Sequence, residues 1–224
     1  MEQYKHKMGL IVPFRDREQH LEVFEPYINN YLKEANIDFS FYLVEQDHGK
    51  AFNKGKIYNI AFKEASKDET LDYFVFHDID MLPEGVDYSY ESQPAHLACS
   101  VSQFNYGLPY DGYFGGVVVF TREDYVKING YSNEYWGWGA EDDDILHRCK
   151  MAGLQTIRKC EGRLNSLDHN RNIVWEEYHK NIEKVRETWA GSENWKNDGL
   201  NSCTEYDIIS IEKVNTRTHI KVSI

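Results

Sequence analysis

The 224-residue sequence lacks several features that would assign it to common protein classes. It has no apolar run of around 20 residues, so no transmembrane helix is encoded. Its first residues, MEQYKHKMGL, lack the apolar segment of a secretory signal. These absences favour a cytoplasmic protein, although a fragment cut away from a membrane anchor would look the same.

Cysteine pairs and linkers are also missing. The four cysteines form no Cys-x-x-Cys pair, which argues against zinc ribbons and redox motifs. We therefore expect reduced thiols in the core at Cys99, Cys149, Cys160 and Cys203. The chain has no repeat, no low-complexity stretch and no linker rich in Gly, Ser or Pro. We expect a single domain over residues 1–224.

Positive charge is scarce. The 25 Lys and Arg residues against 37 Asp and Glu residues give a net charge of −12, which argues against tracking along a nucleic-acid backbone. Such a chain is better suited to holding a cation. The apolar share of 41% and the charged share of 28% exclude a disordered or fibrous protein.

Apolar segments alternate with helical patterns in the first part of the chain. Met8–Phe14, Phe39–Gln46 and Leu71–Asp78 are predicted strands, and residues 17–35 and 54–66 are predicted helices. This alternation is typical of a parallel, doubly wound α/β sheet, which binds ligands at the carboxyl ends of its strands. Later segments predict strands at 96–102 and 115–121, helices at 123–128 and from about 142, and a hairpin of 206–214 and 219–224.

Polar strings follow each of the first three strands: PFRDR, EQDHGKAFNKGK and HDIDMLP. In the third string, strand periodicity directs Asp78 and Asp80 to one face. Two close carboxylates are costly unless a cation or protons neutralise them, and oxygen ligands suit divalent ions that also bind phosphate. The string therefore indicates a metal–diphosphate site, with a solvated acidic turn as the alternative.

The other two strings offer groups that match a nucleotide. Arg15 and Arg17 stand where a strand gives way to a helix, and guanidinium forks match phosphate or a pyrimidine edge. Phe52 and Lys54 place an aromatic face beside a cation. Each string alone also fits an ordinary salt bridge or loop.

YWGWGAEDDD, at residues 135–144, combines tryptophans, glycines and four successive carboxylates. Gly137 and Gly139 permit unusual backbone angles, so the segment can hinge. We expect Trp138 to cap a ligand and a carboxylate behind it to accept a proton from a hydroxyl nucleophile. His169, in LDHNRN, is a candidate metal ligand only if Asp80 lies beside it.

Taken together, VPFRDR, FNKGKIYN, FHDIDMLP, LPYDGYFGG, INGYSNEYWGWGAEDDD, DHNR and DGLNS resemble, in order, the motifs of the β-1,4-galactosyltransferase family. The resemblance spans residues 10–206. It implies a GT-A type fold, a mainly parallel Rossmann-like sheet flanked by helices with a smaller antiparallel part. It also implies inverting transfer of galactose from UDP-galactose to a hydroxyl of an acceptor glycan or glycoconjugate, with Mn²⁺ or another divalent cation.

The resemblance also implies roles for individual residues. Asp142 matches the catalytic base, Tyr110 and Asp143 match acceptor contacts, and Asp80 and His169 match the metal ligands. The residues that match donor contacts are Pro13, Phe14, Arg15, Arg17, Phe52, Lys54, Asp78, Tyr113, Gly116, Trp138 and Glu141.

Some positions depart from the family pattern. Ser166 and Leu167 stand where relatives often have a second metal ligand, and Lys54 replaces the usual arginine. Tyr113 is the residue that accompanies galactose donors in the family. The alternatives are a transferase that uses UDP-N-acetylgalactosamine or UDP-glucose, and a non-catalytic module that binds a nucleotide sugar.

Overall fold

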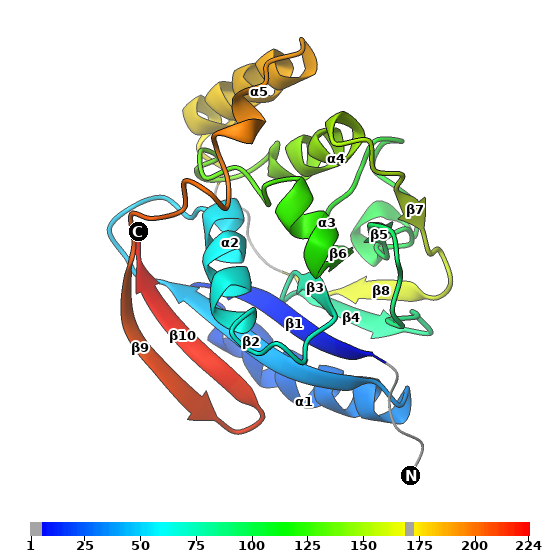
Figure 1. Ribbon diagram of the computed structural model, residues 1–224. Helices are drawn as coiled ribbons and strands as arrows, with labels where there is room; N and C mark the ends of the chain where they lie inside the picture. The colour runs from blue at the N-terminus through cyan, green and yellow to red at the C-terminus, as the bar shows by residue number, and fades with distance from the viewer. Residues whose placement is uncertain (1–5, 169–172) are drawn as a thin grey trace.

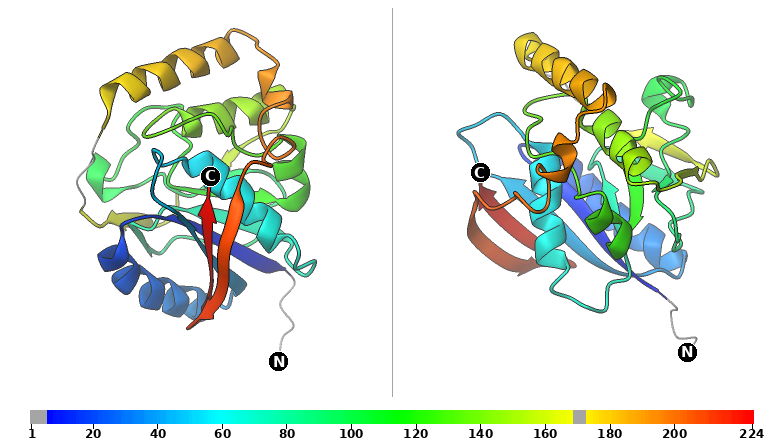
Figure 2. Two further views of the ribbon diagram at one scale, coloured as in Figure 1. Left: turned by 90° about the vertical axis from the view of Figure 1, so that its left-hand side faces the viewer. Right: turned by 45° about the horizontal axis from the view of Figure 1, so that its top comes forward.

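The computed structural model describes residues 6–168 and 173–224, and an eight-stranded sheet forms its centre. The sheet order is β7-β5-β6-β3-β1-β2-β10-β9, and helices cover both of its faces (Figure 1). One apolar core lies between the sheet and α2, α3 and α4, and a second lies between the sheet and α1. The view from the side in Figure 2 shows α1 below the sheet and α2 above it.

The first half of the fold confirms the predicted alternation. It consists of β1 (Lys7–Phe14), α1 (Glu18–Glu34), β2 (Asp38–Gln46), α2 (Lys54–Ala65) and β3 (Tyr73–His77). Strand β1 pairs in parallel with both β2 and β3. The carboxyl ends of these strands therefore lie at one edge of the sheet, as expected for a doubly wound arrangement.

The second half is less regular. It contains β4 (Met81–Glu84), β5 (Ala95–His96), β6 (Val117–Thr121), α3 (Arg122–Lys127), α4 (Glu141–Met151), β7 (Ile157–Arg158), β8 (Arg163–Ser166), α5 (Trp175–Trp189), β9 (Asp207–Val214) and β10 (Arg217–Ser223), with short 3-10 helices at Ser102–Phe104 and Asn194–Lys196. The predicted late hairpin is confirmed, and its strand β10 pairs in parallel with β2. Strands β4 and β8 form the small antiparallel sheet.

One predicted strand is wrong in extent. The sequence predicts a strand at 96–102, but β5 ends at His96. Leu97, Ala98 and Val101 are buried, so the apolar run is a core segment rather than a sheet strand. Within that run, Cys99 is covalently tied to Cys160.

That disulfide corrects the prediction of four reduced thiols. Cys99 and Cys160 are joined across 61 residues, with their Cα atoms 5.1 Å apart, whereas Cys149 and Cys203 are buried free thiols. Neither spacing nor neighbouring residues in the sequence point to this pairing. In the described parts of the chain, no helix is long and apolar enough to cross a membrane.

We predict that the Cys99–Cys160 link contributes on the order of 4 kcal/mol to the free energy of unfolding, because it closes a long loop in the unfolded chain. Replacing both cysteines by serine should lower the melting temperature, and a reductant should then have no further effect. Counting thiols in the denatured, unreduced protein provides the direct check: two are expected, and four would contradict the pairing.

Candidate active site

The ammonium group of Lys54 brings together carboxylates from two separate segments. Its Nζ atom lies 3.4 Å from Asp78 Oδ1, 3.1 Å from Glu141 Oε1 and 3.2 Å from Asp142 Oδ1. Asp78 follows β3 directly, Lys54 begins α2 and Glu141 begins α4. The structure thus gathers four of the predicted site residues around one point at the sheet edge.

The start of α2 is fixed by Asn53. Its side chain accepts a hydrogen bond from the Lys56 backbone N–H (2.8 Å) and donates one to the Asn133 carbonyl (2.7 Å). Gly55 allows the helix to approach the loop before the tryptophans, because a Cβ atom there would lie 2.5 Å from the Ser132 carbonyl oxygen. These contacts hold Lys54 against the segment that leads to α4.

The four carboxylates of the EDDD string have different partners. Glu141 and Asp142 contact Lys54, Asp143 accepts a hydrogen bond from the Tyr110 hydroxyl (2.8 Å), and Asp144 pairs with Arg148 (2.5 Å). All four lie in the first turn of α4, where unpaired backbone N–H groups and the helix dipole favour negative charge. Only Asp144 has a purely structural partner, since Arg148 is buried in the core.

Burial and neighbouring charge shift the pKa values of this cluster. Burial raises the pKa of Asp142 well above its usual value; Lys54 opposes the rise, and Glu141 and Asp78 add to it. The pKa of Asp78 is also raised by burial, against the attraction of Lys54. Burial alone would lower the pKa of Lys54, but the carboxylates around it outweigh that effect and raise it well above its usual value. Asp142 is therefore a stronger base than an exposed aspartate.

Small and aromatic residues surround the Asp142 carboxylate. Gly115 has no side chain, and a Cβ atom there would clash with Asp142 Oδ2. Its carbonyl is held by His96 Nε2 at 2.9 Å. Tyr113 is buried beside it, with its ring edge-on to those of His96 and Tyr110. The neighbouring Gly116 is buried with a φ of +77°, a conformation that favours glycine.

The end of β1 contributes a second group of predicted residues. Arg15 donates a hydrogen bond to the Lys50 carbonyl (2.9 Å), and its guanidinium lies 5.1 Å from the ring centroid of Phe52. Pro13 and Phe14 are buried at the end of the strand. Arg17 is half-buried and donates to the Asp16 carbonyl. The structure thus places Arg15 and Phe52 together, while no described contact joins Arg17 to them.

Only part of the predicted metal site is described. Asp80 is 9% exposed and precedes β4, and its carbonyl accepts a hydrogen bond from the Leu167 backbone N–H (2.7 Å). His169, two positions further on, lies outside the described residues. The Ser166 hydroxyl oxygen is buried with no hydrogen-bond partner among the described residues. A carboxylate and an orphaned hydroxyl fit an ion that prefers oxygen ligands, although the described residues hold no group of three or more His, Cys, Asp or Glu side chains suited to a metal.

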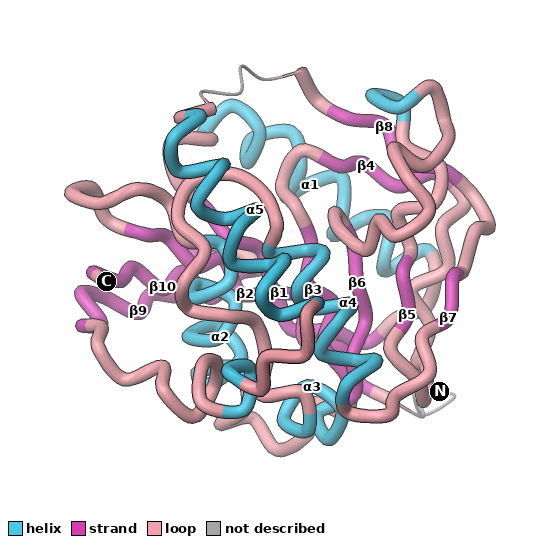
Figure 3. The backbone as a smooth tube through the Cα atoms, turned by 90° about the horizontal axis from the view of Figure 1, so that it is seen from above, coloured by secondary structure: helices cyan, strands magenta, loops and turns pink. Residues whose placement is uncertain are grey.

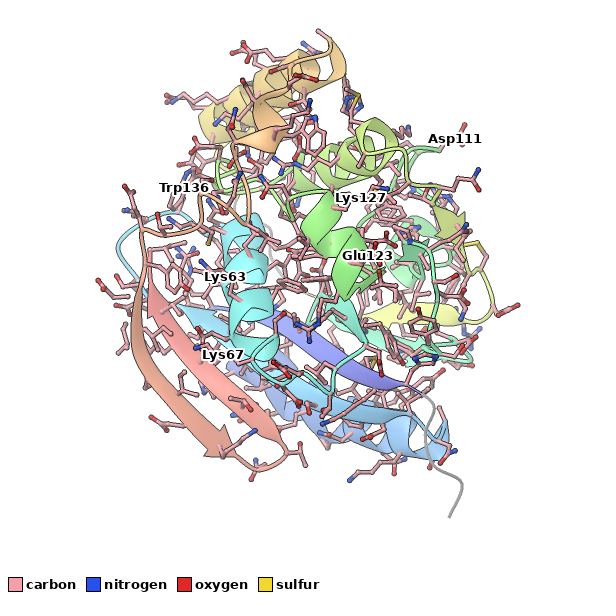
Figure 4. All side chains as sticks on the ribbon, in the orientation of Figure 1. Lys63, Lys67, Asp111, Glu123, Lys127 and Trp136 are labelled. Atoms are coloured by element: carbon pink, nitrogen blue, oxygen red, sulfur yellow. A yellow bond between two sulfur atoms is a disulfide. The ribbon has the colours of Figure 1, made fainter. Side chains whose placement is uncertain are left out.

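The segment before α4 that carries Trp136 and Trp138, named here the tryptophan loop, packs against α5. The sequence patterns considered above do not predict this helix. The Trp138 side chain is 45% exposed, and its ring stacks on that of Tyr178 with centroids 5.5 Å apart. Asn181 donates a hydrogen bond to the Trp136 carbonyl (2.9 Å), and Trp136 lies between α2 and α5 (Figure 4). The apolar spacing of Tyr178, Ile182, Val185 and Trp189 was the available signal for this helix. Seen from above, α5 lies beside α4 (Figure 3).

Comparisons with known proteins agree with this geometry. Residues 3–93 match a family model described as the N-terminal region of glycosyl transferase group 7, and residues 95–170 match one described as the N-terminal domain of galactosyltransferase. Human β-1,4-galactosyltransferase 4 is 37% identical over 92% of this chain, and human β-1,4-galactosyltransferase 1 is 35% identical over 98%. The chain spans 60% and 55% of the lengths of these two relatives.

Two solved structures share the fold. The catalytic domain of Drosophila β1,4-galactosyltransferase 7, in complex with xylobiose, has a TM-score of 0.83 and 30% identity, with 98% of this chain and 94% of that chain covered. A mutant of the same enzyme, in complex with manganese, UDP-Gal and xylobiose, has a TM-score of 0.78 and 28% identity over the same shares of the two chains.

The mixed, mostly parallel sheet with flanking helices and a small antiparallel sheet is therefore a GT-A type glycosyltransferase fold. Within that class, the chain belongs to the β-1,4-galactosyltransferase family.

We predict that Lys54→Met destabilises the fold by about 3 kcal/mol at neutral pH, because it leaves buried carboxylates without their cation. Losing the cation raises the folded-state pKa values of Asp78 and Asp142 further above those of the unfolded chain. The loss of stability should therefore be small near pH 4 and grow as pH rises through the folded-state values.

Urea unfolding at several pH values measures this dependence. Lys180→Met is the matched control, since Lys180 forms an exposed pair with Glu176 on α5 and its loss should cost under about 1 kcal/mol. A Lys54→Met variant as stable as the parent at pH 8 would show that the ion pairs do not hold the site together.

Proposed function

We propose that this chain is a single catalytic domain that transfers galactose from UDP-galactose to a hydroxyl group of an acceptor sugar, with inversion at the anomeric carbon. The observation that carries the proposal is the meeting of Asp78, Glu141 and Asp142 around Lys54, in a chain of this family. Two structures of one relative, one with UDP-Gal and manganese and both with xylobiose, support the choice of donor and acceptor class.

The donor would lie along the carboxyl edge of the sheet. Arg15 and Phe52, which already contact each other, offer a cation and an aromatic face for the uridine, next to Pro13 and Phe14. Arg17, two positions after Arg15, would belong to the same uridine-binding segment. Lys54, Asp78, Gly116 and Glu141 would contact the galactose, and Trp138 would cover it from the loop.

Asp80 and His169 would hold the divalent cation. The backbone hydrogen bond from Leu167 to Asp80 supports this pairing, because it fixes the chain two positions before His169 next to the carboxylate-bearing residue. When bound, the cation neutralises the charge that develops on the departing diphosphate. The orphaned hydroxyl of Ser166 would provide an oxygen near the place where relatives often have a second protein ligand.

Asp142 would be the general base. Its carboxylate would accept the proton of the acceptor hydroxyl while that oxygen attacks the anomeric carbon from the face opposite UDP. The bond from that carbon to the diphosphate oxygen breaks, and UDP leaves with the electron pair. A pKa raised by burial suits this role, because a stronger base accepts the proton more readily. Asp143 and Tyr110, joined by a hydrogen bond, would orient the acceptor.

Tyr113 favours galactose over N-acetylgalactosamine as the transferred sugar. Its ring is only 9% exposed and packs against the rings of His96, Phe104 and Tyr110. A side chain confined on several sides cannot move to admit a bulkier substituent at the second carbon of the sugar.

The Cys99–Cys160 disulfide supports an oxidising compartment rather than the cytoplasm as the site of action.

We predict that Asp142→Asn lowers kcat by about two to four powers of ten, as expected for loss of a general base. Release of UDP should be measured with manganese, a panel of UDP-sugars and xylose, glucose and N-acetylglucosamine acceptors. The variant should still bind UDP as the parent does, which separates loss of chemistry from loss of folding. Equal rates for variant and parent would reject Asp142 as the base, and preference for another UDP-sugar would reject galactose.

A second prediction concerns pH. Because Asp142 must be ionised to accept a proton and its pKa is raised, kcat/KM should fall as pH drops through a value above that of an ordinary aspartate. Lys54→Met removes the main attraction to the ionised form and should move this acid limb to higher pH. The residual activity of Asp142→Asn should lack the limb, and an unchanged profile in both variants would assign the titration to another group.

A further inference from the structure

Arg158, the last residue of the short strand β7, connects two parts of the site. Its Nη1 atom donates a hydrogen bond to His96 Nδ1 (2.7 Å), and its Nη2 atom donates one to the Asp111 carbonyl (2.7 Å). Strands β5 and β7 pair in parallel in a register that sets His96 opposite Arg158, which brings the first two groups together. Asp111 directly follows Tyr110, so the second contact holds the loop on the acceptor side of the site.

The contact with Arg158 determines the tautomer of His96. A guanidinium carries only donors, so His96 Nδ1 must be the unprotonated nitrogen that accepts. In a neutral ring the hydrogen then lies on Nε2, which donates it to the Gly115 carbonyl at 2.9 Å. Burial lowers the pKa of His96 to about 4, the bond to the Gly115 carbonyl opposes this shift and the Arg158 charge adds to it, so the ring is neutral at neutral pH.

Gly115 carries this contact to the proposed base. Its backbone passes close to the Asp142 carboxylate and the Tyr113 ring, since a Cβ atom there would clash with Asp142 Oδ2 and lie 2.8 Å from Tyr113 Cε2. The carbonyl of the next residue, Gly116, accepts a hydrogen bond from the Asp78 N–H (2.8 Å). A shift of the Gly115 carbonyl would therefore displace the backbone that borders the base.

Both of these acceptors of Arg158 are neutral. An arginine that serves only as a counter-charge is expected beside a carboxylate, whereas this one directs two donors to an imidazole nitrogen and a carbonyl. The planar guanidinium holds those donors in a fixed geometry, which a lysine does not. The shape of the side chain, more than its charge, thus ties the loop after Tyr110 to the backbone beside Asp142.

We propose that Arg158 is a positioning residue for the transfer: it fixes the tautomer of His96, and thereby the backbone beside Asp142, and it fixes the loop that follows Tyr110. The inference rests on the proposed transfer to a sugar hydroxyl. Arg158 and His96 act through other residues rather than by touching the substrates. The consequence is that turnover and acceptor use depend on Arg158, whereas binding of UDP does not.

Nitrogen-15 NMR of the imidazole rings in the whole chain tests the tautomer directly, with His96→Gln used to assign the His96 signals. In the parent, His96 should have a protonated Nε2 and an unprotonated Nδ1. Arg158→Met removes the donor to Nδ1, so the His96 signals should show a mixture of both neutral tautomers. A protonated Nδ1 in the parent, or an unchanged tautomer in Arg158→Met, would overturn the proposal.

Transfer kinetics test the consequence. Arg158→Met should lower kcat/KM for the acceptor by about 10–100-fold, as expected for a small misplacement of reacting groups, with the Kd for UDP in the presence of manganese unchanged. Arg158→Lys keeps the charge but not the fork, so it should recover only part of the loss. His96→Gln should retain most of the activity, because an amide both accepts and donates, whereas His96→Phe should lose as much as Arg158→Met.

Arg163→Met is the matched control. Arg163 forms an exposed fork with Glu84, at 2.8 and 2.9 Å, so its loss should leave the kinetics of the parent intact. Parent-like kinetics in Arg158→Met, full recovery in Arg158→Lys, or a matching loss of UDP binding in Arg158→Met would overturn the positioning role while leaving the transferase proposal in place. No transfer by the parent to any acceptor would overturn both.

Discussion

The site depends on a single ammonium group. Lys54 lies within 3.4 Å of three carboxylates that come from the end of β3 and the start of α4. Without a cation there, burying these charges side by side would destabilise the contact between the two segments. A lysine suits three separate partners, because its compact charge carries three donors, whereas the planar fork of the arginine usual in the family best matches one carboxylate.

The same constraint explains the acidic run that opens α4. Three partners serve its four carboxylates: Arg148 fixes Asp144 to the core, Tyr110 orients Asp143, and Lys54 holds both Glu141 and Asp142. The helix N-terminus reduces the cost of placing them together. Asp142 is thus kept buried and basic at the start of a helix that the Asp144–Arg148 ion pair anchors to the core.

The sequence predicted the parallel half of the fold and the convergence of three polar strings, because strand and helix periodicity determine which ends share an edge. It could not predict contacts that depend on distant side chains. The Cys99–Cys160 disulfide and the two-residue length of β5 both follow from packing that no local pattern encodes. The family resemblance implied roles for Asp142 and Asp80, but only the structure revealed that Lys54 joins Asp78 to Asp142.

The tryptophan loop and α5 pack directly against each other. A Cβ atom at Gly137 would contact Glu177 and one at Gly139 would contact Tyr178, so both glycines allow the tryptophan loop to lie directly on α5. The stacking of Trp138 on Tyr178 adds a side-chain contact to the same interface. Because the loop leads into α4 and α5 packs beside α4, the loop and the two helices form one contiguous packed unit.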